Sequence, residues 1–166
     1  MGYGVVRTDN MTGTDVRAEL VSVRYQPSDT KTAIENGNVV KIGDLETGSR
    51  EVYKGLTPAA NNNIKDIVLV ASPEVMYDER KRDLDEFINE AGTIARGYHL
   101  HTNDIFSVTI DALDGNSEPA VGDVVELKAG TKLNVVDSLT NGSTKVGDII
   151  DINIVGKYTY YAIKVC

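Results

Sequence analysis

The sequence predicts a mainly β protein, a barrel or sandwich of short antiparallel strands with one short helical excursion. Three observations support this. Short runs of alternating or continuous β-branched residues recur along the 166 residues. Turn-forming pairs such as Asn36-Gly37 and Asn141-Gly142 separate those runs. Only residues 76–89 have the apolar spacing of an amphipathic helix.

The N-terminal residues 1–15 are rich in Gly, Thr, Asn and Asp and lack a periodic apolar pattern. They predict an extended, flexible arm, mostly disordered in the free protein and ordered on a partner. An extended arm can add itself as a strand to a neighbour's sheet edge. Its candidate partner-binding residues are Tyr3, Val5, Val6 and Arg7.

From Val16 the pattern changes to alternation, and we expect a β-rich domain over residues 16–166, with a division into two small lobes left open. The first strand runs to Tyr25, with a slip of register that suggests a bulge. Residues 66–71 are apolar on both faces and predict a central strand. The other strands are expected at 39–42, 51–54, 97–100, 105–110, 123–127, 132–136, 148–155 and 158–165.

The expected core collects the inward positions of these strands. It comprises Val21, Val23, Ile42, Val68, Val70, Phe106, Val108, Val125, Leu127, Val135, Ile150, Ile152, Ile154 and Ile163. The helical stretch at 76–89 is densely charged, so it can bury only a narrow stripe. We therefore expect it to be one or two surface turns or an irregular excursion, not a central helix.

Composition excludes several classes of function. The chain has 17 Lys and Arg against 25 Asp and Glu, a net charge of −8, which argues against binding to a nucleic-acid backbone. No apolar run approaches the roughly 20 residues of a transmembrane helix, and the N-terminus has no signal-peptide pattern, so no membrane partner and a soluble compartment are expected. The single cysteine, Cys166, excludes an internal disulfide and a Cys-based zinc site.

Catalytic motifs are not recognisable in the sequence. It has no Gly-x-Gly-x-x-Gly, no Gly-Lys-Ser/Thr phosphate loop and no Gly-x-Ser-x-Gly elbow. We therefore expect a binding or structural protein that is not an enzyme and uses no cofactor or metal.

Two alternatives stay open. His99 and His101 lie two apart on a predicted strand, so both side chains would project from one face, and Asp104 could join them in a metal-dependent β-barrel enzyme. A structural role for the two histidines is the simpler interpretation. Tyr158, Tyr160 and Tyr161 could instead form the platform of a carbohydrate-binding module, although a half-buried strand explains them more simply.

Residues 34–113 as a whole resemble virion structural proteins of tailed bacteriophages, most closely the capsid (head) decoration or cement proteins. The resemblance rests on residues 35–43, 51–54, 66–74, 84–92 and 96–108. The chain departs from the small, Thr- and Pro-rich decoration proteins because it is longer, has only 4 Pro and carries the charged stretch at 76–89. No residue of a family site can be transferred to it.

The resemblance implies a β-rich module that binds the outside of a phage capsid and cements coat subunits. Its partner would be the major capsid protein, and homo-oligomers, with a trimer favoured, are typical. It also implies a place on the capsid surface of the virion after synthesis in the host cytoplasm. Simultaneous engagement by several copies would strengthen attachment without any new kind of contact.

Overall fold

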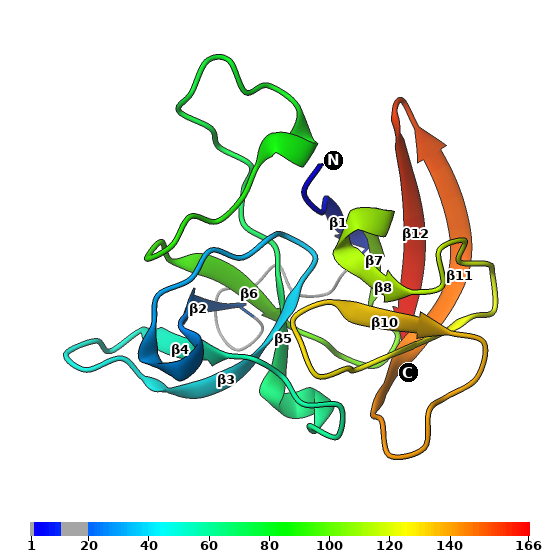
Figure 1. The fold of residues 1–166 in the computed structure, drawn as a ribbon, viewed down its shortest axis with the longest axis horizontal. Coiled ribbons are helices and arrows are strands. Elements are labelled where there is room, and N and C mark those ends of the chain that lie inside the picture. The colour runs from blue at the N-terminus through cyan, green and yellow to red at the C-terminus, as the bar shows by residue number, and fades with distance from the viewer. Residues whose placement is uncertain (1, 11–19) are drawn as a thin grey trace.

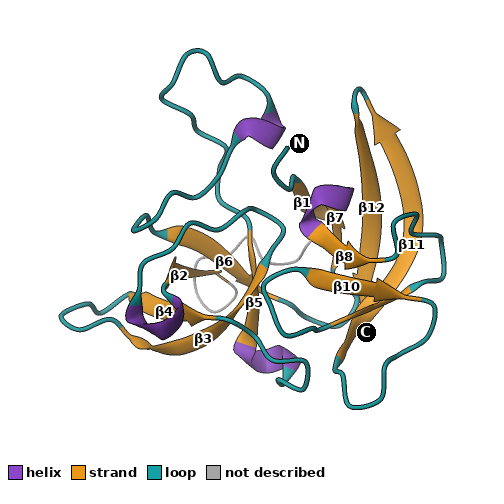
Figure 2. Ribbon diagram, viewed as in Figure 1, coloured by secondary structure: helices purple, strands orange, loops and turns teal. Residues whose placement is uncertain are grey.

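The computed structural model describes residues 2–10 and 20–166 and is mainly β, as the sequence predicts (Figure 1). Its helices are single 3₁₀ turns in the connections between strands (Figure 2). Among the described residues none of these turns is a candidate membrane span. The strands are β1 Val6–Asn10, β2 Leu20–Tyr25, β3 Val39–Leu45, β4 Val52–Leu56, β5 Ile67–Val70, β6 Ala95–His99, β7 Ile105–Val108, β8 Leu113–Gly115, β9 Val124–Glu126, β10 Leu133–Val136, β11 Lys145–Val155 and β12 Tyr158–Val165.

One part of the fold is a closed barrel with the strand order β2-β4-β3-β5-β6. It closes because β6 pairs with β5 on one side and with β2 on the other. Most pairs are antiparallel, as expected, but β2 and β4 run parallel. The inside of the barrel is filled by small and β-branched side chains, namely Val23, Ile34, Val40, Val68, Val70 and Ala95.

The other part is a curled sheet with the order β1-β7-β12-β11-β9-β10-β8. It packs against the outside of the barrel, and the two share one core. Strand β5 belongs to both cores: Val68 and Val70 face the barrel interior, while Ile67 and Leu69 face the sheet. All four side chains are fully buried, which confirms the prediction of a central strand with two apolar faces.

The first residues do not form a separate arm. Strand β1 pairs antiparallel with β7, and Val6 lies opposite Val108. Val5 and Val6 are buried in the chain's own fold. The predicted boundary at residue 15 is therefore wrong for residues 2–10, because two adjacent valines gain more by burial against β7 than by exposure. Residues 11–15, and residues 16–19 of the predicted first strand, lie outside the described part of the chain.

A bulge in β11 moves the predicted core. The pairing with β12 shifts between Ile149 and Asp151, so one residue of β11 has no partner of its own in β12. Ile149 is therefore fully buried, whereas Ile150 is exposed and Ile154 is 78% exposed. The sequence prediction placed Ile150 and Ile154 in the core and was wrong for two reasons. Ile150 is the extra residue at the bulge, and Ile154 lies near the tip of the hairpin, which extends past the rest of the sheet.

The predicted helical stretch at 76–89 is a loop that projects from the barrel. Its one helical turn in the described chain is the 3₁₀ turn η3, Leu84–Glu86, which a capping box begins at Asp83. The irregular excursion is thus confirmed, and a regular helix is not formed. Charged residues at 78–83 leave too little apolar surface to hold a longer helix on the barrel.

Candidate functional site

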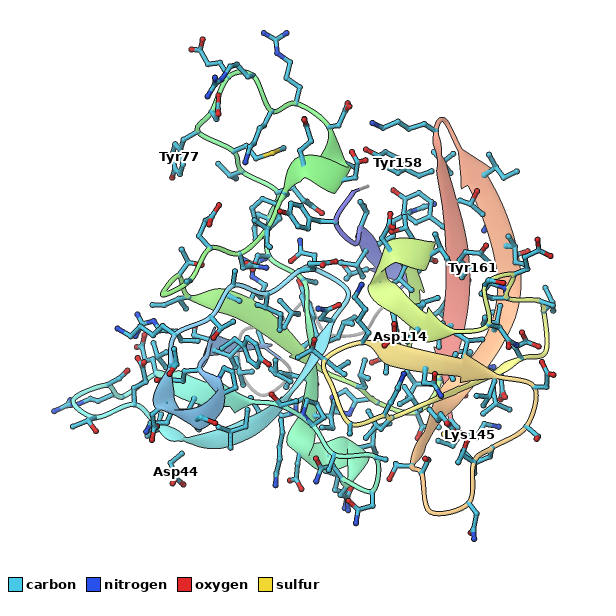
Figure 3. All side chains as sticks on the ribbon, in the orientation of Figure 1. Asp44, Tyr77, Asp114, Lys145, Tyr158 and Tyr161 are labelled. Carbon is cyan, nitrogen blue, oxygen red and sulfur yellow. The ribbon has the colours of Figure 1, made fainter. Side chains whose placement is uncertain are left out.

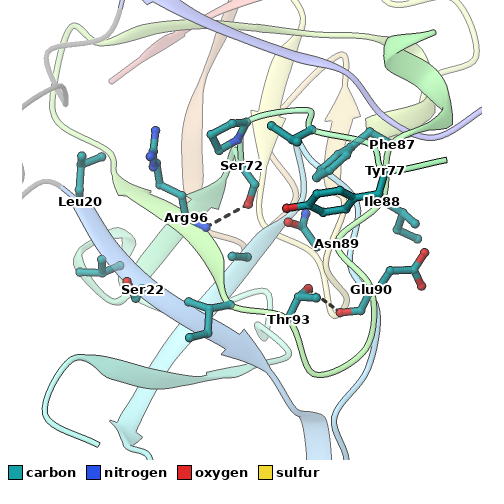
Figure 4. Close-up of a pocket in the computed structure, with 15 residues that line it drawn as sticks. Leu20, Ser22, Ser72, Tyr77, Phe87, Ile88, Asn89, Glu90, Thr93 and Arg96 are labelled. Carbon is teal, nitrogen blue, oxygen red and sulfur yellow. Dashed lines mark hydrogen bonds between the residues drawn. The ribbon is translucent and has the colours of Figure 1, made fainter. Parts of the chain in front are cut away.

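An open groove of about 690 Å³ lies between the projecting loop and the barrel (Figure 4). Strands β2 and β6 form one wall, and the two ends of the loop form the other. The lining side chains are mostly apolar. They are Leu20, Val21, Ser22, Ser72, Pro73, Val75, Tyr77, Phe87, Ile88, Asn89, Glu90, Thr93, Ile94, Ala95 and Arg96.

Two buried asparagines fix the loop where it leaves and rejoins the body of the protein. The side chain of Asn36 donates to the carbonyl of Ser72 (2.9 Å) and accepts from the N–H of Ser72 (3.0 Å). The same Asn36 Oδ1 accepts from the Nδ2 of Asn89 at 3.1 Å. Asn89 also pairs through its backbone with Ile34. One side chain therefore joins both ends of the loop, which together form one wall of the groove.

The wall on the barrel side is fixed as well. The N–H of Arg96 donates to Ser72 Oγ at 3.0 Å, and the hydroxyl of Thr93 donates to the carbonyl of Glu90 at 2.6 Å (Figure 4). Arg96 and Glu90 are exposed, which places a cation on one wall and an anion on the other. The groove thus combines an apolar lining with two charged side chains at its margin.

The rim carries large apolar side chains that water reaches. Tyr77 is 95% exposed, Val75 is 61% exposed and Ile94 is 51% exposed. Figure 3 shows Tyr77 on the projecting loop, and Figure 4 shows its ring beside the groove. Exposed apolar groups gathered around a concave surface are typical of sites where a partner binds.

The far end of the loop is attached to the β11–β12 hairpin at Asp85. The Asp85 carboxylate accepts from the hydroxyl of Tyr158 (3.1 Å) and lies 3.3 Å from the amine of Lys157. Its backbone carbonyl accepts from the N–H of Tyr3 at 2.8 Å. Partial burial acts to raise the pKa of the Asp85 carboxyl, but the hydrogen bonds from Tyr158 and Lys157 outweigh it and hold that pKa below its ordinary value. The loop, the hairpin and the N-terminal segment thus meet at one residue.

The predicted partner-binding residues lie beside this junction and are largely occupied within the chain. Val5 and Val6 are buried, and the N–H of Val5 donates to the hydroxyl of Thr109. The guanidinium of Arg7 lies 5.4 Å from the centre of the Tyr160 ring, a cation–π contact. Tyr3 is partly exposed. None of the four lines the groove.

The two histidines do not share a strand face. Strand β6 ends at His99, which is half-buried, and His101 lies beyond it in an exposed turn. The N–H of His101 donates to the buried Asp104 carboxylate at 3.0 Å, which closes that turn. Within residues 2–10 and 20–166, no group of three or more His, Cys, Asp or Glu side chains could hold a metal ion.

The three tyrosines are arranged as parts of the fold. The rings of Tyr158 and Tyr160 lie 6.1 Å apart at 50°, and Tyr160 is buried, which raises the pKa of its hydroxyl. Tyr161 packs against the shared core on the other face of the strand. A sugar ring needs an open aromatic surface for stacking, and this tilted, buried arrangement does not provide a flat one.

Sequence reasoning missed the groove. The available signal was Val75 and Tyr77, two large apolar residues next to a charged stretch, together with the asparagines at 36 and 89. Nothing in the sequence alone brings these four positions together. No protein-family model, no curated protein and no solved structure matches the chain.

Proposed function

We propose that the chain is a non-enzymatic virion structural protein that binds the outside of a phage capsid and cements coat subunits through the groove between the loop and the barrel. The observation that carries the proposal is the groove itself, with the exposed rim of Val75, Tyr77 and Ile94. The resemblance in residues 34–113 supplies the class of partner, the major capsid protein. The groove supplies a surface on which such a partner can bind.

The groove suits a protein segment better than a small molecule. It is open along its length, and its largest rim side chain, Tyr77, is nearly fully exposed. Tyrosine at the margin of an apolar surface is typical of protein interfaces, where it contributes much of the binding free energy. Arg96 and Glu90 would fix the direction of a bound segment that carries one acidic and one basic group.

The walls of the groove are held before any partner binds. Asn36 joins both ends of the loop, and Asp85 attaches its far end to the hairpin. A surface held in its bound conformation loses less conformational entropy on association, which favours affinity. A cement protein that adds to a finished shell benefits from such a preformed surface.

The remaining parts of the proposal follow from the same role. The protein acts as a homo-oligomer on the capsid surface of the virion, and several engaged copies attach more firmly than one. It is made in the host cytoplasm and needs no nucleic-acid or membrane partner. The net charge of −8 supports this, since it disfavours binding to nucleic acid and to anionic lipid surfaces.

The test is attachment of the purified chain to capsids of the phage that encodes it. Copies per particle are counted at saturation, and Tyr77→Ser and Val75→Ser are compared with the wild type. The matched control is Val121→Ser, because Val121 is 61% exposed, like Val75, but lies between β8 and β9, away from the groove. Removal of an interface anchor is expected to weaken attachment by about tenfold or more.

Two outcomes would contradict the proposal in different ways. If the wild type does not bind the particles and is absent from purified virions, the capsid role is wrong. If Val75→Ser and Tyr77→Ser bind as tightly as Val121→Ser, the chain attaches through another surface.

A further inference from the structure

The distal half of β11 is an open sheet edge. Near its start, β11 pairs with β9, and the N–H of Ile149 still donates to the carbonyl of Asp123. Beyond Ile149, no strand in the described part of the chain pairs with this side of β11. Figure 1 shows the β11–β12 hairpin extending past the rest of the sheet, with β11 at its outer margin.

The hairpin geometry shows which backbone groups point outward. Val155 and Tyr158 flank the two-residue turn Gly156-Lys157, and Gly156 has φ +62°, as a type II′ turn requires. The pair next to such a turn exchanges hydrogen bonds, and antiparallel pairs alternate from there. The N–H and C=O groups of Ile154 and Ile152 therefore point away from β12.

The edge lacks most of the features that prevent strands from pairing. Residues 150–155 read Ile-Asp-Ile-Asn-Ile-Val, with no proline and no lysine, and Asp151 is their one charge. Ile154 is 78% exposed and Val155 is 50% exposed. The bulge between Ile149 and Asp151 bends the strand at its base, but residues 151–155 beyond it pair regularly with β12.

We propose that this edge pairs with the same edge of a second copy of the chain, antiparallel and centred on Asn153. In that register, Ile152 of each copy lies opposite Ile154 of the other copy. The outward N–H and C=O groups of these isoleucines then form hydrogen-bonded pairs between the two copies. The same register places Asp151 opposite Val155, and the two aspartates do not face each other. The segment is therefore complementary to itself in both hydrogen bonding and charge.

A second copy is the occupant that this pattern favours. In a two-fold contact, the same surface of both copies meets, so each residue of the surface must be complementary to the residue that it contacts on the other copy. Residues 151–155 meet this condition, since each β-branched residue faces another β-branched residue or the aliphatic part of Asp151. The contact is small, so association is expected to be weak and to depend on protein concentration. This inference does not rest on the capsid role.

The test combines cross-linking with measurement of mass in solution, using the full chain with Cys166→Ser. Asn153→Cys places two thiols across the two-fold axis, close enough for a disulfide under a mild oxidant. Asp151→Cys is the matched control on the same strand. In the proposed register its two thiols are four residues apart along the strands, about 14 Å, which is too far for a disulfide.

Sedimentation over a wide range of concentration should show a dimer. Ile154→Pro removes an outward N–H without removing a hydrogen bond to β12, so it should raise the dimer dissociation constant at least tenfold while the Tm changes little. The proposal is overturned if the chain stays monomeric at every concentration. It is also overturned if Asp151→Cys cross-links as readily as Asn153→Cys, if Ile154→Pro leaves the association unchanged, or if a trimer forms that Asn153→Cys does not cross-link.

Discussion

Lys157, at the tip of the β11–β12 hairpin, donates a hydrogen bond of 2.6 Å to the carboxylate of Asp83 in the projecting loop. The two residues are 74 positions apart in the sequence, and each is more than half exposed. The two carboxylates of Asp83 and Asp85 raise the pKa of Lys157 well above its ordinary value, so the amine stays charged at neutral pH. The pair thus adds one attachment between the loop and the hairpin and contributes little to overall stability.

We predict that Lys157→Met loosens the loop without unfolding the protein. Amide hydrogen exchange in residues 78–86 should become several-fold faster, because the loop loses one of its attachments to the hairpin. The Tm should stay nearly unchanged. The control is Lys145→Met, which removes an ion pair with Asp148 on β11 and should leave exchange in the loop as it is. Equal exchange in the two variants would show that the Lys157 contact does not hold the loop.

The buried carboxylate of Glu126 should matter more for stability. It accepts three hydrogen bonds, two from Thr140 and one from Asn134. Glu126→Ala leaves these donors without their acceptor and is expected to lower the free energy of unfolding by about 1–3 kcal/mol. Urea titration measures this loss, and Glu118→Ala, at an exposed position, is the control.

The effect of Glu126 should also depend on pH. Burial acts to raise the pKa of Glu126, but the hydrogen bonds from Thr140 and Asn134 outweigh it and hold that pKa below the ordinary value. A lowered pKa in the folded state means that the charged form favours folding. The contribution is complete above the ordinary pKa of about 4.3 and is lost as the pH falls through the lower, folded-state pKa. The stability difference between wild type and Glu126→Gln should therefore shrink in acid.

Two isoleucines on strand β11, one buried at its base and one exposed near the hairpin tip, are predicted to give opposite results. Ile149 is fully buried, so Ile149→Ala should lower the free energy of unfolding by about 2–5 kcal/mol. Ile154 is 78% exposed, so Ile154→Ala should change it by less than about 0.5 kcal/mol. Denaturant titration measures both at low protein concentration, where association is absent. A large loss for Ile154→Ala would mean that the Ile154 side chain is buried and not exposed as described.

Gly97 on β6 lies where the barrel has no room for a side chain. A Cβ added there would meet Val68 Cγ2 at 2.8 Å and Val21 Cγ2 at 3.1 Å. Gly97→Ala should therefore destabilise the protein by about 1–3 kcal/mol, the usual cost of overpacking a core. If Val68→Ala is added, it should relieve part of this cost. Equal stability of Gly97→Ala and the wild type would mean that the barrel is more loosely packed than described.

The N-terminal segment should stabilise the free protein. Val5 and Val6 are buried, and complete burial of a side chain of this kind contributes about 1.5–3 kcal/mol. Removal of residues 2–10 should lower the Tm by several degrees, since about 1 kcal/mol corresponds to 2–4 °C for a chain of this size. If the truncated chain has the same Tm as the wild type, the result would support the flexible arm that the sequence predicts.

Much of the strand pattern could be predicted from the sequence because each strand carries a local signal. The last strand, residues 158–165, has the predicted bounds, since a Gly-Lys turn precedes it and most of its residues are aromatic or aliphatic. All four residues of Ile67–Val70 are apolar, so a strand that is buried on both faces could be predicted from the sequence. Such features depend on neighbouring residues alone, and those are visible in the chain.

Features that depend on distant contacts could not be predicted. Val5 and Val6 are two residues without an alternating pattern, and only the opposing strand β7 shows why they are buried. The bulge near Ile150 leaves the composition of the strand unchanged while it moves one isoleucine out of the core. The groove depends on Asn36 meeting Ser72 and Asn89, 36 and 53 residues away.

The position of strand β5 between the two cores determines how the molecule unfolds. The four residues of β5 close the barrel interior with one pair of side chains and seal the neighbouring sheet with the other. Neither half can come apart while the other stays intact, because loss of this strand exposes both interiors to water. Heat or denaturant should therefore produce one cooperative transition, with the calorimetric enthalpy equal to the van't Hoff enthalpy. For the same reason, neither the barrel nor the sheet is expected to fold when expressed alone.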